Sequence, residues 1–254
     1  MKHYEKMIQL GCFSRHSLAG ALGCGLNTAA TTIGQYLKKG YIERVRHDCY
    51  AVISLETKQP VPSRYQIGGS LFPDGCVSHH SAFEVYGCAN QVFYEVYVAT
   101  NSRFKDFSYN GVLYRRVAPR TERFITNAGP VRLTTVERTV VDSIADLSKI
   151  AGLEEILRCI LLVPSLDGDI LLEILEEYQN GFLYQKCGLI LEAFNDTIGL
   201  PVYFFEKCQE HIPGTKRYLV EKQREQVLYK KWNLYAPKGI QNILQKGVSV
   251  DDTV

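Results

Sequence analysis

The N-terminal fold is decided by the stretch Asn27-Thr28-Ala29-Ala30-Thr31-Thr32-Ile33-Gly34-Gln35-Tyr36-Leu37-Lys38-Lys39, which Gly40 follows. Apolar residues recur at helical spacing here, at Leu26, Ala30, Ile33 and Leu37. This period predicts an amphipathic helix over residues 28–39 that buries one stripe. Asn27 is a good N-cap for that helix, and Gly40 would end it.

The polar side chains of this helix lie away from the stripe, at Thr28, Thr31, Thr32, Gln35 and Lys39. Short polar side chains on an open face can hydrogen-bond to base edges or phosphates without blocking entry into a DNA major groove. The helix therefore has the composition of a DNA recognition helix.

The flanking segments complete a small domain. Residues 4–10 have helical character, Ser14 is placed as the N-cap of a second helix, and residues 41–53 alternate around a polar turn. Three short helices followed by a β-hairpin predict a winged helix-turn-helix, with the recognition helix at 27–39 and the wing at 44–47.

In such a domain the helix would read the groove while basic side chains bind phosphates. The residues expected to contact DNA are Arg15, Asn27, Thr28, Thr31, Thr32, Gln35, Lys38, Lys39, Arg44, Arg46 and His47. The alternative is a protein–protein module, since winged helices also serve that purpose.

Charge is unevenly divided along the 254 residues, although the net charge is only +2. Residues 1–60 hold eight Lys or Arg against four Asp or Glu, whereas residues 149–254 hold twelve against fifteen. This split favours a basic nucleic-acid-binding head on a faintly acidic body. A polar segment with two prolines predicts the boundary: a winged helix-turn-helix at 1–56, a linker at 57–64 and a mixed α/β body at 65–254.

The body reads as strands followed by helices, so the predicted fold class is α+β. Thr134 and Glu137 fit a capping box that opens a helix, and residues 201–205 read as a strand. The sequence has no apolar run long enough to cross a bilayer and no secretory h-region, so we expect a cytoplasmic protein with no membrane partner. The eight cysteines form no C-x-x-C pair, which favours reduced thiols.

The enzyme-like candidates all have structural explanations. A zinc site could use Cys76, His79, His80 and Cys88, but their spacing matches no standard signature. The E-x-K of Glu56 and Lys58 lies in the predicted linker, and Glu137, Arg138 and Asp142 fit a cap and an i, i+4 ion pair. No phosphate-binding or nucleophile motif occurs, so we expect no catalytic residue, no metal and no cofactor.

Several runs look familiar in their order along the chain. They are 40–45 with Tyr50 closing the wing, 77–87, 96–100, 136–142, 188–192 and 231–237. Together they resemble the AbiEi family of bacterial type IV antitoxins, across nearly the whole chain. One departure concerns the wing, because that family usually carries Gly before the Tyr and here Cys49 precedes Tyr50.

The resemblance implies an N-terminal winged helix that binds inverted repeats in double-stranded DNA at its own promoter and represses it. It also implies an antitoxin domain that counters a nucleotidyltransferase-like toxin without forming a stable complex with it. Neither activity needs catalysis by this chain. The alternatives are a stand-alone winged-helix regulator whose body senses a ligand or dimerises, and an enzyme with a DNA-targeting head.

Overall fold

The computed structural model describes residues 2–221 and 226–244. They divide into two compact units: unit 1 comprises Met1–Val77, Phe93–Pro119 and Thr126–Leu133, and unit 2 comprises Ser78–Val92, Arg120–Ile125 and Thr134–Val254. Both contain helices and strands, which confirms the predicted α+β class. The boundary expected at 57–64 is not where the units separate, because unit 1 takes in the N-terminal segment together with strands of the body.

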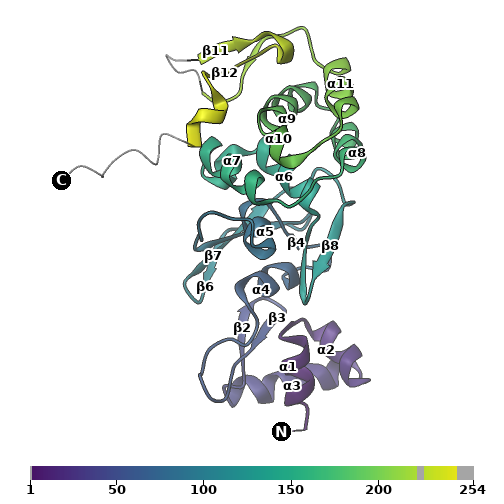
Figure 1. The fold of residues 1–254 in the computed structure, drawn as a ribbon. Coiled ribbons are helices and arrows are strands. Elements are labelled where there is room, and N and C mark those ends of the chain that lie inside the picture. The colour runs from purple at the N-terminus through teal and green to yellow at the C-terminus, as the bar shows by residue number, and fades with distance from the viewer. Residues whose placement is uncertain (1, 222–225, 245–254) are drawn as a thin grey trace, which may run out of the picture. The chain divides into compact units, whose positions relative to one another are not determined.

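Unit 1 begins with three helices and a hairpin, followed by a helix and a larger sheet (Figure 1). Its elements are α1 (Tyr4–Leu10), β1 (Cys12–Phe13), α2 (Arg15–Leu22), α3 (Leu26–Lys38), β2 (Ile42–Arg46), β3 (Cys49–Val52), α4 (Arg64–Ser70), β4 (Cys76–Val77), β5 (Glu95–Ala99), β6 (Phe107–Tyr109), β7 (Val112–Val117), β8 (Ile125–Ala128) and β9 (Val131–Thr134).

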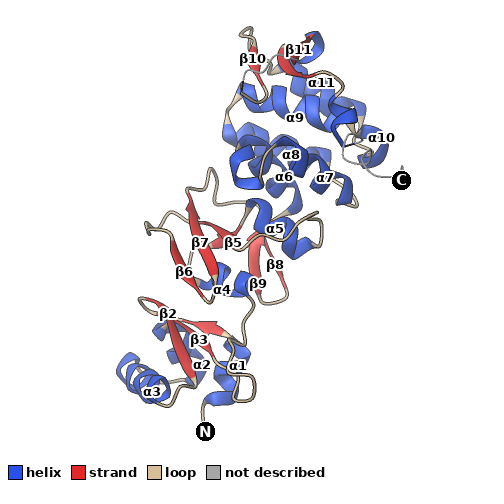
Figure 2. Cartoon of the chain, turned by 90° about the vertical axis from the view of Figure 1, so that its left-hand side faces the viewer, coloured by secondary structure: helices blue, strands red, loops and turns tan. Residues whose placement is uncertain are grey.

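The three helices and the hairpin predicted at the N-terminus are present. Ser14 caps α2 by accepting from the Ser17 backbone N–H, as predicted. Strands β1, β3 and β2 form a three-stranded sheet in that order, and a core that includes Met7, Leu18 and Ile42 joins it to the helices (Figure 2). The hairpin β2–β3 turns at two residues, His47 and Asp48.

Helix α3 is rotated from the predicted orientation. Its buried residues are Ala29, Thr32, Ile33 and Tyr36. Of the predicted stripe only Ile33 is buried, and Leu26 is 41% exposed. The helix starts earlier than expected, with Gly25 as N-cap, so the prediction of Asn27 as N-cap is wrong. Tyr36, which contributes an aromatic ring to the core, shifts the buried face by about one residue.

The segment predicted as a linker is folded back on β3. Ser54 N donates to Gln59 O at 2.9 Å, and Val61 N donates to Val52 O at 2.8 Å. Ile53 and Pro60 form an isolated bridge. These backbone hydrogen bonds make a compact turn of a stretch whose proline content suggested an extended linker.

The remaining strands of unit 1 form a mixed six-stranded sheet with the order β6-β7-β5-β4-β9-β8 (Figure 2). Strands β5 and β7 are parallel, and β4 pairs parallel to β9 and antiparallel to β5. Helix α4 packs closely on this sheet, because a Cβ at Gly68 would lie 2.7 Å from Val96 Cγ1.

Unit 2 is mainly helical, and its core is built around α6, α7, α8, α9 and α11 (Figure 1). Its elements are α5 (His79–Tyr86), α6 (Val136–Ala145), η1 (Leu147–Ile150), α7 (Leu153–Leu162), α8 (Gly168–Tyr178), α9 (Gly181–Ala193), α10 (Asn195–Ile198), α11 (Val202–Glu210), β10 (Arg217–Tyr218), β11 (Gln226–Tyr229), η2 (Lys230–Trp232), β12 (Leu234–Pro237) and η3 (Ile240–Leu244).

Two predictions in unit 2 need correction. The N-cap of α6 is Thr135, whose side chain accepts from Arg138 N, while the hydroxyl of Thr134 bonds to that of Thr139. Residues 201–205 are not a strand, because α11 starts at Val202 directly after Pro201. Pro201 did not distinguish the two alternatives, because proline is compatible with the start of a helix as well as with the start of a strand. Among the described residues, no helix is long and apolar enough to cross a membrane.

Candidate nucleic-acid interface

The outward face of α3 is open and polar. Asn27, Thr28, Thr31, Gln35, Lys38 and Lys39 are all exposed. At 3.6 residues per turn, Asn27, Thr31, Gly34 and Lys38 form a line directly opposite the buried face. These side chains can approach a partner along the whole length of the helix.

Thr32, one of the residues expected to contact DNA, is on the other side. It is only 9% exposed, and its hydroxyl donates to Thr28 O at 2.9 Å. The rotation of α3 places it in the core, so it is removed from the set that can reach DNA.

Three of the predicted basic residues meet around one small hollow. Arg15 at the start of α2, Arg44 on β2 and His47 in the hairpin turn line a cavity of about 150 Å³ together with Asp48 and Tyr50. Arg44 Nη2 donates to Tyr50 Oη at 3.4 Å, and its Cζ lies 5.8 Å from the Tyr50 ring centre. The hydrogen bond with Tyr50 raises the pKa of Arg44 further above its usual value.

Arg46 does not join this group. Its Cζ stacks 4.2 Å from the ring centre of Phe72 and lies 5.3 Å from that of Phe104 and 5.9 Å from that of Phe107. Burial lowers the pKa of Arg46, and its Nη1 is buried with no hydrogen-bond partner among the described residues. The expectation that Arg46 binds phosphate is therefore withdrawn, because its guanidinium is occupied by aromatic rings.

The hairpin turn is organised by Asp48 rather than by a glycine. Asp48 has a φ of 51°, a left-handed conformation that Asp tolerates, and its Oδ1 accepts from Arg15 N at 3.1 Å. Cys49, which departs from the usual Gly of the resembling family, stays in β3 with its Sγ 3.4 Å from that of Cys12. Asp48 and Tyr50 also line the hollow, although neither was expected among the DNA-contacting residues, and the left-handed turn position was the signal for Asp48.

The arrangement suits an anionic polymer. Two guanidiniums and a histidine beside the middle of α3, where Ala30 and Ile33 also line the hollow, can bind phosphate oxygens, while the open line of α3 faces outward. The Asp48 carboxylate is the single acidic side chain that lines the hollow, and it offsets part of the positive charge.

The residues considered and set aside as zinc ligands have other roles. Cys76 belongs to unit 1, whereas the others belong to unit 2. His80 forms a buried cluster with Glu155 and Cys159 instead, with Nε2 3.1 Å from Glu155 Oε1. Glu155 also accepts from the backbone N–H groups of Asn90 and Gln91. Hydrogen bonding thus uses the carboxylate that a metal would need.

A second polar group holds the start of α5. His79 Nδ1 lies 3.0 Å from Ser78 Oγ, and its Nε2 lies 3.4 Å from Asp146 Oδ2. Burial raises the pKa of Asp146, but hydrogen bonds from His79, Arg120 and Lys149 outweigh it and hold that pKa far below the usual range. Ser78 has no exposed surface, so its hydroxyl cannot act on a substrate in this arrangement.

The polar residues of α6 are likewise internal. Arg138 is fully buried, its Nε pairs with Asp142 Oδ2 at 3.3 Å, and its Nη1 donates to Arg123 O at 2.7 Å. Tyr178 Oη donates to Asp142 Oδ1 at 2.8 Å. The predicted i, i+4 ion pair of Arg138 and Asp142 is confirmed, and it is buried.

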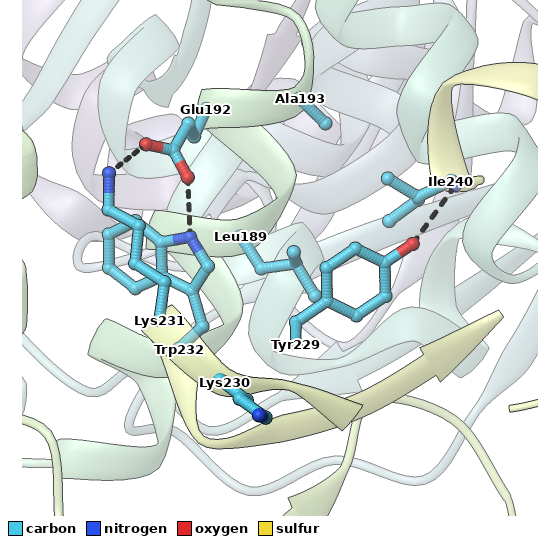
Figure 3. Close-up of a pocket in the computed structure, with 8 residues that line it drawn as sticks. All are labelled: Leu189, Glu192, Ala193, Tyr229, Lys230, Lys231, Trp232 and Ile240. Atoms are coloured by element: carbon cyan, nitrogen blue, oxygen red, sulfur yellow. Dashed lines mark hydrogen bonds and ion pairs between the residues drawn. The ribbon is translucent and has the colours of Figure 1, made fainter. Parts of the chain in front are cut away.

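Unit 2 has a hollow of its own, of about 380 Å³. Figure 3 shows Glu192 on α9 facing Lys231 and Trp232, with Tyr229 and Ile240 at the opposite wall. Glu192 accepts from Trp232 Nε1 at 2.6 Å and pairs with Lys231. The runs 188–192 and 231–237, which carry part of the family resemblance, thus lie against one another.

Comparison with known proteins adds a likeness in fold. No family model and no curated protein matches the chain. Among solved structures, the RV2827C protein from Mycobacterium tuberculosis is similar, with a TM-score of 0.59 over 92% of this chain and 89% of that chain at 12% sequence identity. At this identity the similarity concerns the fold alone.

Proposed function

We propose that residues 1–56 are a winged helix-turn-helix that binds double-stranded DNA at the promoter of its own gene and represses transcription. The observation that carries this proposal is the exposed polar line of α3 next to the hollow of Arg15, Arg44 and His47. The helix would enter the major groove, and the hollow would bind a phosphate of the flanking backbone.

A gel-shift experiment with the duplex upstream of the gene tests the DNA-binding step. We expect the full chain to shift this duplex, and the variant Asn27→Ala/Thr31→Ala to lose preference for it over a scrambled duplex, because these side chains face the bases. Lys207→Ala, an exposed cation of unit 2, is the matched control and should bind like the wild type. Failure of the wild-type chain to shift the duplex would contradict the proposal.

For the rest of the chain we propose an antitoxin activity against a nucleotidyltransferase-like toxin. The support is the ordered family resemblance. Its two late runs, 188–192 and 231–237, also contact each other, at Gly188 and Trp232. Where a neighbouring gene encodes a nucleotidyltransferase that stops growth, co-expression of the full chain should restore growth. Arg44→Ala should lose promoter repression and keep this rescue. Absence of rescue by the wild type would refute the antitoxin activity and leave DNA binding standing.

A ligand-sensing regulator is the second candidate, and the hollow in Figure 3 favours it. Its volume of about 380 Å³ lies in the range of small-molecule sites, and it combines apolar walls with a few polar groups. A genome neighbourhood without a nucleotidyltransferase gene, together with DNA binding that a small molecule changes, would favour this alternative over the antitoxin.

A further inference from the structure

Helix α3 carries a glycine in the middle of its outward face. Gly34 lies three residues after Thr31 and four before Lys38, so it continues the outward line that begins at Asn27, although Gly34 itself is half-buried. An interior helical glycine is less stable than alanine by roughly 0.5–1 kcal/mol, because it loses more backbone entropy on folding.

The fold itself does not require this glycine. A Cβ added at Gly34 would meet no atom of the described residues within 4 Å. The backbone there is ordinary right-handed helix, since Gly34 is not among the residues with positive φ. An alanine would fit and would strengthen α3, so packing within the described residues gives no reason for a glycine here.

We infer that Gly34 is the point at which the backbone of α3 comes nearest to a bound DNA duplex; this inference rests on the DNA binding proposed above. Without a Cβ, which projects about 1.5 Å from Cα, the helix can settle deeper against the wall of the groove. The chemistry of the face selects a duplex as the occupant. Helix α3 contains no acidic residue, Lys38 lies one turn beyond Gly34, and the hollow of Arg15 and Arg44 adjoins the helix.

The test uses Gly34→Ala in the full chain, with Gly20→Ala as a matched control. Gly20 is also a glycine inside a helix, α2, where it is exposed, and a Cβ there would likewise meet nothing of the described residues within 4 Å. Both variants should raise Tm by about 1–4 °C, because each removes the same entropic penalty. Only Gly34→Ala should weaken binding to the upstream duplex, by roughly tenfold, since its methyl group keeps the helix out of the groove.

Each outcome of the paired experiment is decisive. A Gly34→Ala variant that is stabilised and binds as tightly as wild type overturns the inference and leaves the proposed function intact. A lower Tm would overturn it too, by showing that the fold needs the glycine. Loss of self-association in sedimentation, with DNA affinity unchanged, would assign the close approach to a second copy of the chain. A wild-type chain that binds no duplex would refute the proposed function itself.

Discussion

Gly34 and Gly188 each lie in the interior of a helix of thirteen residues, but their surroundings in the structure differ. A Cβ at Gly34 would meet open space, whereas a Cβ at Gly188 would overlap the ring of Trp232. Gly188 is therefore explained by packing within unit 2, and Gly34 is not explained by packing at all. Residues that the fold does not need are the ones to test for function.

The same contrast holds for polar side chains. Those on the outer face of α3 are exposed, whereas Arg138 and Asp142 on α6 are buried and paired with one another. Both helices are amphipathic in sequence, so periodicity alone cannot tell an interaction face from an internal network. Burial and partners separate them.

The largest expected effect follows from the packing of Gly188. Gly188→Ala should lower the free energy of unfolding by about 3 kcal/mol, because the added methyl group forces Trp232 away from Glu192. Urea denaturation measures this change. Trp232→Phe in the same background should recover part of the loss, since the two substitutions share one contact. A Gly188→Ala chain as stable as wild type would contradict the claim that packing against Trp232 explains Gly188.

Two arginines of β2 sharpen the contrast between open and buried positions. Arg46→Ala should lower the free energy of unfolding by roughly 2 kcal/mol, because it removes the guanidinium that lies over the Phe72 ring. Arg44→Ala should leave stability nearly unchanged and should make the dependence of DNA affinity on salt shallower by about one unit of slope. Chemical denaturation and binding titrations at several salt concentrations separate the two. The assignment fails if Arg46→Ala, and not Arg44→Ala, reduces the salt slope.

The pH dependence of stability tests the hydrogen bonds and ion pairs that Asp146 makes within unit 2. Its pKa is held well below the ordinary value of a free Asp side chain, so the folded chain binds fewer protons than the unfolded chain at acidic pH. The resulting stability is present above about pH 4 and is lost as the pH falls further. Asp146→Asn should remove on the order of 1 kcal/mol at pH 7 and less at pH 3. An equal loss at both pH values would contradict this account.

The smallest expected effect concerns Asp48 in the hairpin turn. Asp48→Asn keeps a side chain that tolerates positive φ and can still accept from Arg15 N, but it removes the negative charge from the hollow. DNA affinity should rise by about two- to threefold at low salt, with Tm unchanged. Weaker binding would mean that the hollow does not face phosphate.

The sequence predicted the order of the N-terminal helices and the hairpin because caps such as Ser14 and turns such as His47–Asp48 are local signals. It predicted the rotation of α3 wrongly, since Tyr36 could be assigned to either face and only packing against the sheet decides. Arg46 was misassigned for a related reason: Phe72 and Phe104 lie far from it in sequence and meet it only through the fold. The hollow around Glu192 and Trp232 likewise joins segments about forty residues apart.

The central claim is that the N-terminal region binds the chain's own promoter as duplex DNA. Fluorescence anisotropy of the wild-type chain with the upstream duplex and with a scrambled duplex, over a range of salt concentrations, tests it most directly. The account predicts tighter binding to the upstream duplex, with affinity falling by roughly the third power of salt or more steeply, because several phosphates are contacted. Equal affinity for both duplexes, or no binding at low salt, would contradict it.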